Sequence, residues 1–110
     1  MEVSELRVEG LPEAPIDAAA AFYAEHVPLI REDSPGADMV VIHFQPAGHE
    51  HRGWRLAAVQ ELARELAPTR VNAIVGSDNA GMAEALNFLH LAPGVTGQLL
   101  AVDGKSGGKG

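Results

Sequence analysis

Three histidines and a glutamate near the middle of the 110-residue sequence are the side chains best suited to chemistry. His49 and His51 flank Glu50, and His43 precedes them in the same region. Imidazole nitrogens and carboxylate oxygens ligate zinc, and imidazole also transfers protons near neutral pH. An H-x-H pair occurs in ordinary solvated loops as well, so two interpretations stay open. We favour a solvated loop with His43 packed inside the protein over a metal site, and we assign no metal ligand.

Other polar residues directly follow apolar runs of sequence. Gln45 follows the run 38–44, and the loop Gly76-Ser77-Asp78 follows the run 70–75. If these runs are parallel strands, their carboxyl ends meet at one edge of a sheet, where ligands of such folds bind. Helix N-termini at Gly53 and Ser77 could hold an anion there. The candidate ligand-binding residues are therefore His43, Gln45, His49, His51, Ser77 and Asp78, and no catalytic residue is assigned.

Four runs with strand character alternate with three helical runs and would position these residues. The apolar and β-branched composition predicts strands at 5–9, 38–44, 70–75 and 98–102. Apolar residues at helical spacing predict helices at 18–30 and 54–67, and a third that begins at a Ser77 or Asp78 cap and stops at Pro93. Met82, Ala85, Leu86 and Leu89 would form the apolar stripe of this third helix.

The first helix is the least regular of the three. Asp17 is its predicted N-cap, and Pro28 should kink the helix or end it early. A partial apolar stripe contains Phe22, His26, Leu29 and Ile30. Tyr23, which is the only tyrosine, is interpreted as a packing or interface residue, and Trp54 as an exposed contact residue beside the histidine loop.

The order βαβαβαβ predicts an α/β fold with a four-stranded parallel sheet in sequential strand order. We expect right-handed crossovers and helices on both faces, giving three layers. The domain would comprise residues 1–103. The tail 104–110, which contains only glycine, lysine and serine, is predicted to be flexible.

Composition restricts the classes of partner. The net charge of −7 disfavours nucleic acid and anionic membranes as main partners, because both attract basic surfaces. No apolar run has the length of a membrane span, and the N-terminus lacks the pattern of a signal peptide. The chain contains no cysteine, which excludes disulfides and thiolate chemistry. We therefore expect a cytoplasmic protein that does not bind membranes.

The last third of the chain also resembles a known family. Residues 70–74 read RVNAI, residues 83–89 read AEALNFL, and residues 95–104 read VTGQLLAVDG. This succession is similar to the closing segment of the short-chain dehydrogenase/reductase superfamily, and looser likeness extends back through 26–44 and 57–74. The resemblance implies a truncated, partial Rossmann-like domain that corresponds to the C-terminal half of the family's fold.

The family's catalytic positions hold other residues in this sequence. Gln45 stands where the family's strand ends in serine. The family's tyrosine and lysine, four residues apart, match Gly48 with Arg52 in one alignment register, or Arg52 with Leu56 in another. No glycine-rich cofactor motif is found in the sequence. The resemblance thus implies a protein that has lost the family's hydride transfer, so we lean against an enzyme and expect no cofactor, although NAD(P) is possible.

Association is the function that this pattern favours. In the family, two long central helices form a dimer interface, and the last helix and strand form another; the chain retains counterparts of all these elements. Its first strand would also have an uncovered edge. We therefore predict a non-catalytic protein that acts as a homo-oligomer or as an accessory subunit of a full-length relative. The alternative is an oxidoreductase-like enzyme, or a protein that binds a small ligand or nucleotide, with a rebuilt site at the carboxyl ends of the strands.

Overall fold

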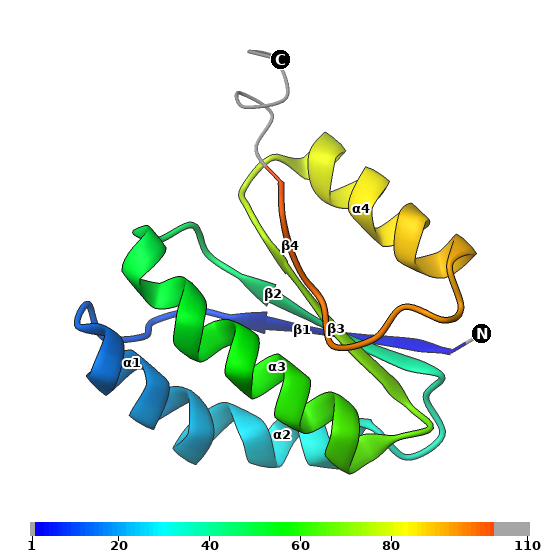
Figure 1. Cartoon of the computed structure of the whole chain (residues 1–110), viewed down its shortest axis with the longest axis horizontal. Helices are drawn as coiled ribbons and strands as arrows, with labels where there is room; N and C mark the ends of the chain where they lie inside the picture. The colour runs from blue at the N-terminus through cyan, green and yellow to red at the C-terminus, as the bar shows by residue number, and fades with distance from the viewer. Residues whose placement is uncertain (1, 103–110) are drawn as a thin grey trace.

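The two most apolar runs of the sequence form the central strands of a parallel sheet in the computed structural model, which describes residues 2–102. All six residues of β2 (Met39–Phe44) are buried, and four of the six residues of β3 (Arg70–Val75) are buried. β1 (Val3–Val8) and β4 (Leu99–Ala101) form the edges, in the order β1-β2-β3-β4 (Figure 1). The predicted parallel sheet with sequential neighbours is confirmed.

The four strands end in register. Val8 pairs with Phe44, Phe44 with Val75, and Val75 with Ala101. The loops that leave β1, β2 and β3 therefore start from one line across the sheet, which we call the carboxyl edge. This alignment brings residues far apart in sequence close together in space.

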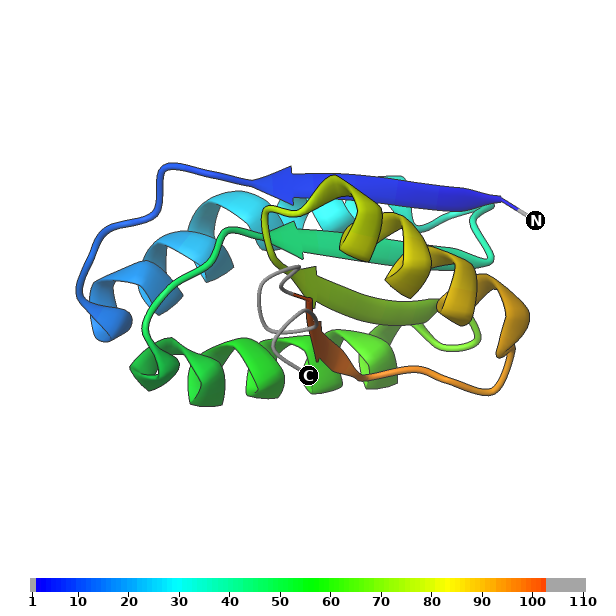
Figure 2. The same ribbon diagram turned by 90° about the horizontal axis from the view of Figure 1, so that it is seen from above.

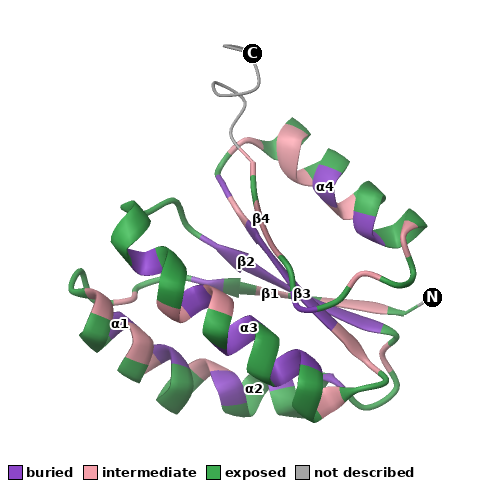
Figure 3. Ribbon diagram, in the orientation of Figure 1, coloured by how far each residue is buried: buried purple, intermediate pink, exposed green. Residues whose placement is uncertain are grey.

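Helices cover both faces of the sheet, as predicted. On one face lie α1 (Pro15–Ala21), the π-helical turn η1 (Phe22–His26), α2 (Val27–Asp33), the 3₁₀ turn η2 (His49–His51) and α3 (Arg52–Leu66). On the other face lies α4 (Asn79–Leu91). The helices on the two faces can be followed in Figure 2, and the buried parts of the elements in Figure 3. Alternate residues of β2 enter two separate cores, with Phe44 in the core beneath α3 and Val41 in the core beneath α4.

The first helical segment differs from the sequence prediction at its start. It begins at Pro15 with Ala14 as the N-cap, so Asp17 lies in the first turn and is not the cap. Proline suits this first position, because the lack of an N–H group costs nothing there. An acidic residue in the first turn also interacts favourably with the positive end of the helix dipole.

The helix also passes through Pro28 instead of ending early. The turn Phe22–His26 widens to a π-helix, and the N–H of Val27 donates to the carbonyl of Phe22. In a regular α-helix, the ring of Pro28 would clash with the carbonyl four residues before it. The π-helical turn Phe22–His26 contains that carbonyl and widens the helix there. The extra residue shifts the buried stripe, so Val27 and Ile30 are buried while Leu29, which was predicted to be on the stripe, is 45% exposed.

One crossover has the opposite hand from the others. The strand order advances in one direction throughout, but α4 lies on the opposite face from α1, α2 and α3. The two earlier connections are right-handed, and the connection from β3 through α4 to β4 is left-handed (Figure 2). The expectation of right-handed crossovers throughout is therefore wrong. Sequential order and helices on both faces together require a change of hand, which is rare among parallel strands.

Arg70, the first residue of β3, holds the end of α4 in this unusual connection. Its Nη1 atom donates to the carbonyl oxygens of Leu89, Ala92 and Val95, at 3.2, 3.0 and 3.1 Å. These carbonyls lie at and beyond the end of α4, where helix carbonyls lack intrahelical partners. A cation at this position also stabilises the negative end of the helix dipole.

Asn72 holds the segment that leads into β4. The side chain is fully buried, its Nδ2 donates to the carbonyl of Val95 at 3.0 Å, and its Oδ1 accepts from the N–H of Gln98 at 3.0 Å. Next to it, the N–H of Gly97 donates to the carbonyl of Val71 at 2.7 Å. The polar residues of the RVNAI run thus fix the return of the chain to the sheet.

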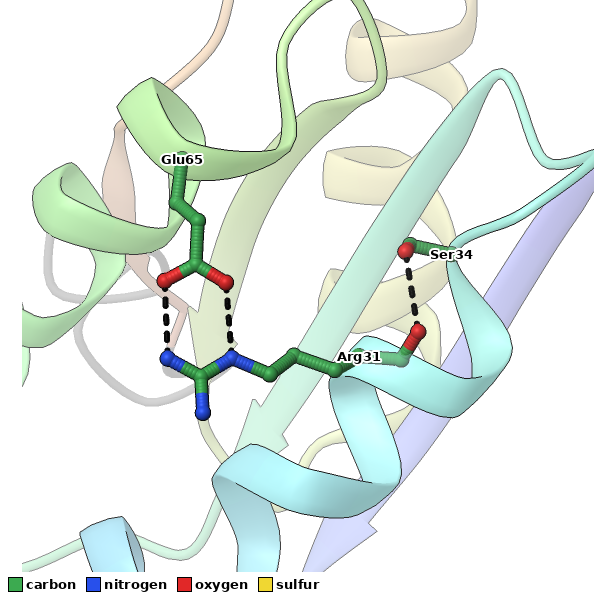
Figure 4. A network of polar contacts seen from close by, with 3 residues as sticks. All are labelled: Arg31, Ser34 and Glu65. Carbon is green, nitrogen blue, oxygen red and sulfur yellow. Dashed lines mark hydrogen bonds and ion pairs between the residues drawn. The ribbon is translucent and has the colours of Figure 1, made fainter.

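An ion pair joins α2 to α3 on the outer surface. Nε and Nη2 of Arg31 donate to the two carboxylate oxygens of Glu65 at 2.7 and 2.8 Å (Figure 4). The hydrogen bond from Arg31 lowers the pKa of Glu65 below its ordinary value. The Oγ atom of Ser34 donates to the carbonyl of Arg31 at 3.1 Å at the end of α2. The fork geometry fixes how the two helices lie against each other.

Element boundaries differ slightly from the sequence prediction. β1 begins at Val3 instead of residue 5, and α3 begins at Arg52 instead of residue 54. No helix within residues 2–102 is both long and apolar enough to cross a membrane. The predicted flexible tail, residues 104–110, lies outside the described residues.

Candidate functional site

Three cavities lie along the carboxyl edge. The largest, of about 430 Å³, lies between the loop after β1 and the loop after β2. A second, of about 300 Å³, lies beside the loop after β3. The third, of about 310 Å³, lies between the first turn of α3 and the ends of β3 and β4. The position agrees with the general rule for parallel sheets, whose ligands bind at the carboxyl ends of the strands.

The predicted site residues are divided among these cavities. Gln45 and His51 line the largest cavity, Ser77 lines the second and His49 lines the third. His43 and Asp78 line none of the three. Four of the six predicted residues therefore line cavities at this edge of the sheet, but the six residues do not form one cluster.

His51 connects the loop after β1 to the first turn of α3 through its two ring nitrogens. Nδ1 accepts from the indole N–H of Trp54 at 3.1 Å, and Nε2 lies 3.0 Å from the carbonyl oxygen of Glu13. An indole nitrogen only donates and a carbonyl only accepts, so the hydrogen-bond network assigns a neutral ring that carries its proton on Nε2. His51 is 7% exposed. Its ring therefore fixes one wall of the largest cavity.

His43 points away from the cavities. Its side chain shares the face of Met39 and Val41, because alternate residues of a strand point to opposite faces. There its Nε2 lies 2.9 Å from a carboxylate oxygen of Glu5 on β1. The ring is buried, as predicted for a packed histidine, and its Nδ1 has no hydrogen-bond partner.

Asp78 is the N-cap of α4. Its Oδ2 atom accepts from the N–H of Gly81 at 2.7 Å, and its backbone is extended as N-cap residues are. Of the two caps that the sequence left open, the structure selects Asp78. Ser77 is then free to line the second cavity beside Val75 and Ala101.

Arg55 is the functional candidate that sequence reasoning missed. It lies in the first turns of α3, is 6% exposed and lines both the largest and the third cavity. Its guanidinium carbon lies 4.5 Å from the centre of the Phe44 ring and 5.8 Å from that of Trp54. Burial lowers the pKa of Arg55 below its ordinary value. A signal was present in the sequence, since Arg55 precedes the buried Ala58 and Val59 by three and four residues and so falls on the apolar face of α3.

The two aromatic residues singled out by the sequence have other roles. Trp54 packs on the core instead of standing exposed, with ring centres 5.5 Å from Phe22 and 5.7 Å from Phe44. The hydroxyl of Tyr23 donates to Glu61 at 3.4 Å on the outer side of α3. Burial, and then the charge and hydrogen bond of Glu61, raise the pKa of Tyr23 above its ordinary value. Tyr23 lines none of the three cavities.

Metal-ligating side chains do not gather in the part of the chain that the structure describes. Among residues 2–102, no three histidine, aspartate or glutamate side chains come together in a group that could hold a metal ion. His49 and His51 line different cavities, and both nitrogens of His51 are already hydrogen-bonded.

The sequence was compared with models of known protein families, and one family matches. The family model described as short chain dehydrogenase-like protein matches residues 6–102. The chain belongs to this short-chain dehydrogenase-like family. Neither the curated proteins nor the solved structures that were compared gave a match.

The residues of this short-chain dehydrogenase-like protein do not fit a nicotinamide dinucleotide. The largest cavity is lined by Glu9, Glu13 and Glu50, whose carboxylates repel a pyrophosphate. The sequence also contains no glycine-rich turn of the kind that receives the pyrophosphate in Rossmann folds, as expected if it corresponds to the C-terminal half of the family's fold. We therefore assign no reaction step to this cofactor.

Proposed function

We propose that this short-chain dehydrogenase-like protein is non-catalytic and acts by association, either as a homo-oligomer or as an accessory subunit of a full-length relative. The observation that carries the proposal is the chemistry at the positions that match the family's catalytic residues. These positions hold Gln45 and, in the two registers, Gly48 with Arg52 or Arg52 with Leu56. None of these side chains releases a proton near neutral pH as a general acid does.

The only phenol in the chain does not replace the missing acid. Tyr23 donates to Glu61 away from the cavities, and its raised pKa disfavours the phenolate form. No lysine occurs in residues 2–102, since both lysines of the chain are at positions 105 and 109. Proton transfer in the family's manner therefore has no donor among the described residues.

Exposed apolar side chains on α4 support the association. Phe88 and Leu91 are 51% and 71% exposed, and their three-residue spacing places them on one side of the helix. Ile16, Tyr23 and Leu29 are exposed on the opposite face of the molecule. Large apolar residues at such positions favour contact with another protein.

Light scattering after size-exclusion chromatography tests the association at low micromolar concentration. We expect a mass above that of the monomer, and a monomer for the double variant Phe88→Glu, Leu91→Glu. The matched control Ile16→Glu, which changes an even more exposed apolar residue on the other face, should keep the larger mass if α4 forms the interface. A monomer at all concentrations that also captures no full-length relative in a pull-down would contradict the proposal.

A second candidate function is the binding of a small ligand at the carboxyl edge, and the cavities there favour it. Calorimetry with oxidised and reduced nicotinamide dinucleotides tests its oxidoreductase-like form. We expect no binding, because carboxylates line the largest cavity. Micromolar binding of either cofactor would instead favour an enzyme over a protein that acts only by association.

A further inference from the structure

Arg55 is a buried cation without a charged partner. It is 6% exposed, its Nε atom has no hydrogen-bond partner, and no carboxylate in the described part of the chain lies within ion-pair distance of its guanidinium. Arginine stays protonated in proteins even when burial lowers its pKa. Among the described residues, its charge is offset by cation–π contacts with the Phe44 and Trp54 rings.

A cation in such a place is costly unless something pairs with it. Buried charges in proteins are therefore paired with an opposite charge, and perturbed ionisable groups in clefts gather at functional sites. No described residue supplies an opposite charge to Arg55. The guanidinium lies next to a cavity, so a ligand can supply that partner.

The third cavity has the lining that an anion requires. Its polar side includes His49, Arg52 and Arg55, and no carboxylate side chain lines it. The largest cavity differs, because three glutamates line it. The N-terminal end of α3, a helix of fifteen residues without a side-chain cap, adds the positive end of its dipole at the same place.

The opposite side of this cavity is apolar. Val75 from the end of β3 and Leu99 and Ala101 from β4 line it. A pocket of about 310 Å³ is at the small end of the range for small-molecule sites. The cavity therefore suits a short ligand with an oxyanion at one end and an apolar body at the other.

We propose that Arg55 and Arg52 bind the oxyanion of a small amphipathic ligand, a carboxylate or a phosphate monoester, whose apolar body lies against Val75, Leu99 and Ala101. The proposal deepens the second function considered above and is independent of association through α4. Arg55 supplies the buried fork that can bind two oxygens at once, and the exposed Arg52 closes the rim.

Trp54 provides a site-specific readout, because it is the only tryptophan and its ring lies 5.8 Å from the Arg55 guanidinium carbon. We would titrate the full chain with hexanoate, monohexyl phosphate, inorganic phosphate and the neutral 1-hexanol, and follow Trp54 emission. At least one of the two amphipathic anions should bind more than tenfold more tightly than 1-hexanol and inorganic phosphate. The tighter of the two identifies the head group as carboxylate or phosphate.

Arg55→Met keeps an apolar stem against Phe44 and removes the charge. It should weaken binding of the preferred anion roughly tenfold to hundredfold, as expected for the loss of charged hydrogen bonds. Without ligand, this variant should also unfold at a higher urea concentration, because an unpaired buried charge has been removed. Arg64→Gln, an exposed arginine on the same helix, is the matched control and should change neither property.

If Arg55→Met does not fold, Arg52→Gln tests the proposal instead. The side chain of Arg52 is exposed, so it can be changed without disturbing the core. It should weaken anion binding severalfold. Equal binding of 1-hexanol and the anions, unchanged anion binding in the folded variants, or no binding at all would overturn the proposal. Any of these results would leave open the binding of nicotinamide dinucleotides, which the separate calorimetry decides.

Discussion

At the scale of single residues, Asn72 shows how much a buried amide can determine. It is fully buried and makes hydrogen bonds to the backbone of Val95 and Gln98. Asn72→Ala leaves the N–H of Gln98 without a partner inside the protein, while the carbonyl of Val95 keeps its hydrogen bond from Arg70. We expect a loss of about 1–3 kcal/mol in the free energy of unfolding, which urea denaturation measures. Asn87→Ala, on the exposed side of α4, should be neutral or slightly stabilising, and a similar loss there would show that the effect is not specific.

Tyr23 offers a direct spectroscopic check, because it is the only tyrosine in the chain. Its pKa is raised above the ordinary 10.0, first by burial and then by Glu61. An absorbance titration should therefore show phenolate forming with a midpoint above 10. Because the folded pKa is raised, this group's contribution to stability is present below pH 10 and is lost as the pH rises through the raised value. Glu61→Gln should lower the midpoint without returning it fully to 10, and a midpoint at or below 10 in the unmodified protein would contradict the assignment.

The site residues could be predicted only in part from the sequence. The position after a buried strand correctly placed Gln45 and Ser77 at the carboxyl edge, because the end of a parallel strand fixes the position of the next residue. The same reasoning failed for His43, which is one residue earlier and so points to the opposite face. Arg55 was missed because a charged residue is usually interpreted as exposed, whatever its place in the helical repeat.

At the scale of elements, the cap of α4 gives a sharp comparison between neighbours. Asp78 accepts a hydrogen bond from the N–H of Gly81, whereas Ser77 lies just before it and is not the cap. Asp78→Ala should reduce the free energy of unfolding by about 1 kcal/mol, measured by urea denaturation. Ser77→Ala should leave it within a few tenths of that of the unmodified protein, and equal losses would mean that both residues cap the helix.

The strands were easier to predict than the first helix, for a physical reason. β3 occupies Arg70–Val75, as the apolar run indicated, because a strand buried on both faces needs little besides apolar side chains. The course of the first helix depends on a π-helical turn before Pro28, and no residue pattern in the sequence specifies such a turn. Because of the one extra residue in that turn, Val27 is buried and Leu29, which was predicted to be buried, is exposed.

At the scale of the whole molecule, the exposed edge of β1 remains protected without a covering strand. Glu5 and Arg7 are exposed along it, and charged residues on an edge strand discourage pairing with another sheet. Arg7→Ile should therefore produce assemblies larger than those of the unmodified protein, with a mass that increases with concentration in light scattering. Arg64→Ile, an equal change on α3, is the control. Masses that match the unmodified protein at every concentration would show that this charge does not protect the edge.

The overall topology could be predicted except for the hand of its last crossover. Strand order and layer structure follow from the alternation of elements and from the family resemblance. The change of hand depends on where the chain returns after α4, and Arg70 and Asn72 determine this by hydrogen bonds that span the connection.

The left-handed connection also divides the molecule into parts of unequal cooperativity. β4 is three residues long and, among the described strands, pairs only with β3. The buried residues of α4 pack in the smaller core, on the face of the sheet opposite α1, α2 and α3. Amide protons in α4 and β4 should therefore exchange with deuterium through a partial opening, well before those of β2 and central β3. Asn72→Ala should accelerate exchange in α4 and β4 more than in β2, and uniform acceleration would show instead that the protein opens only as a whole. The same segment that closes the sheet would then be the first to leave it.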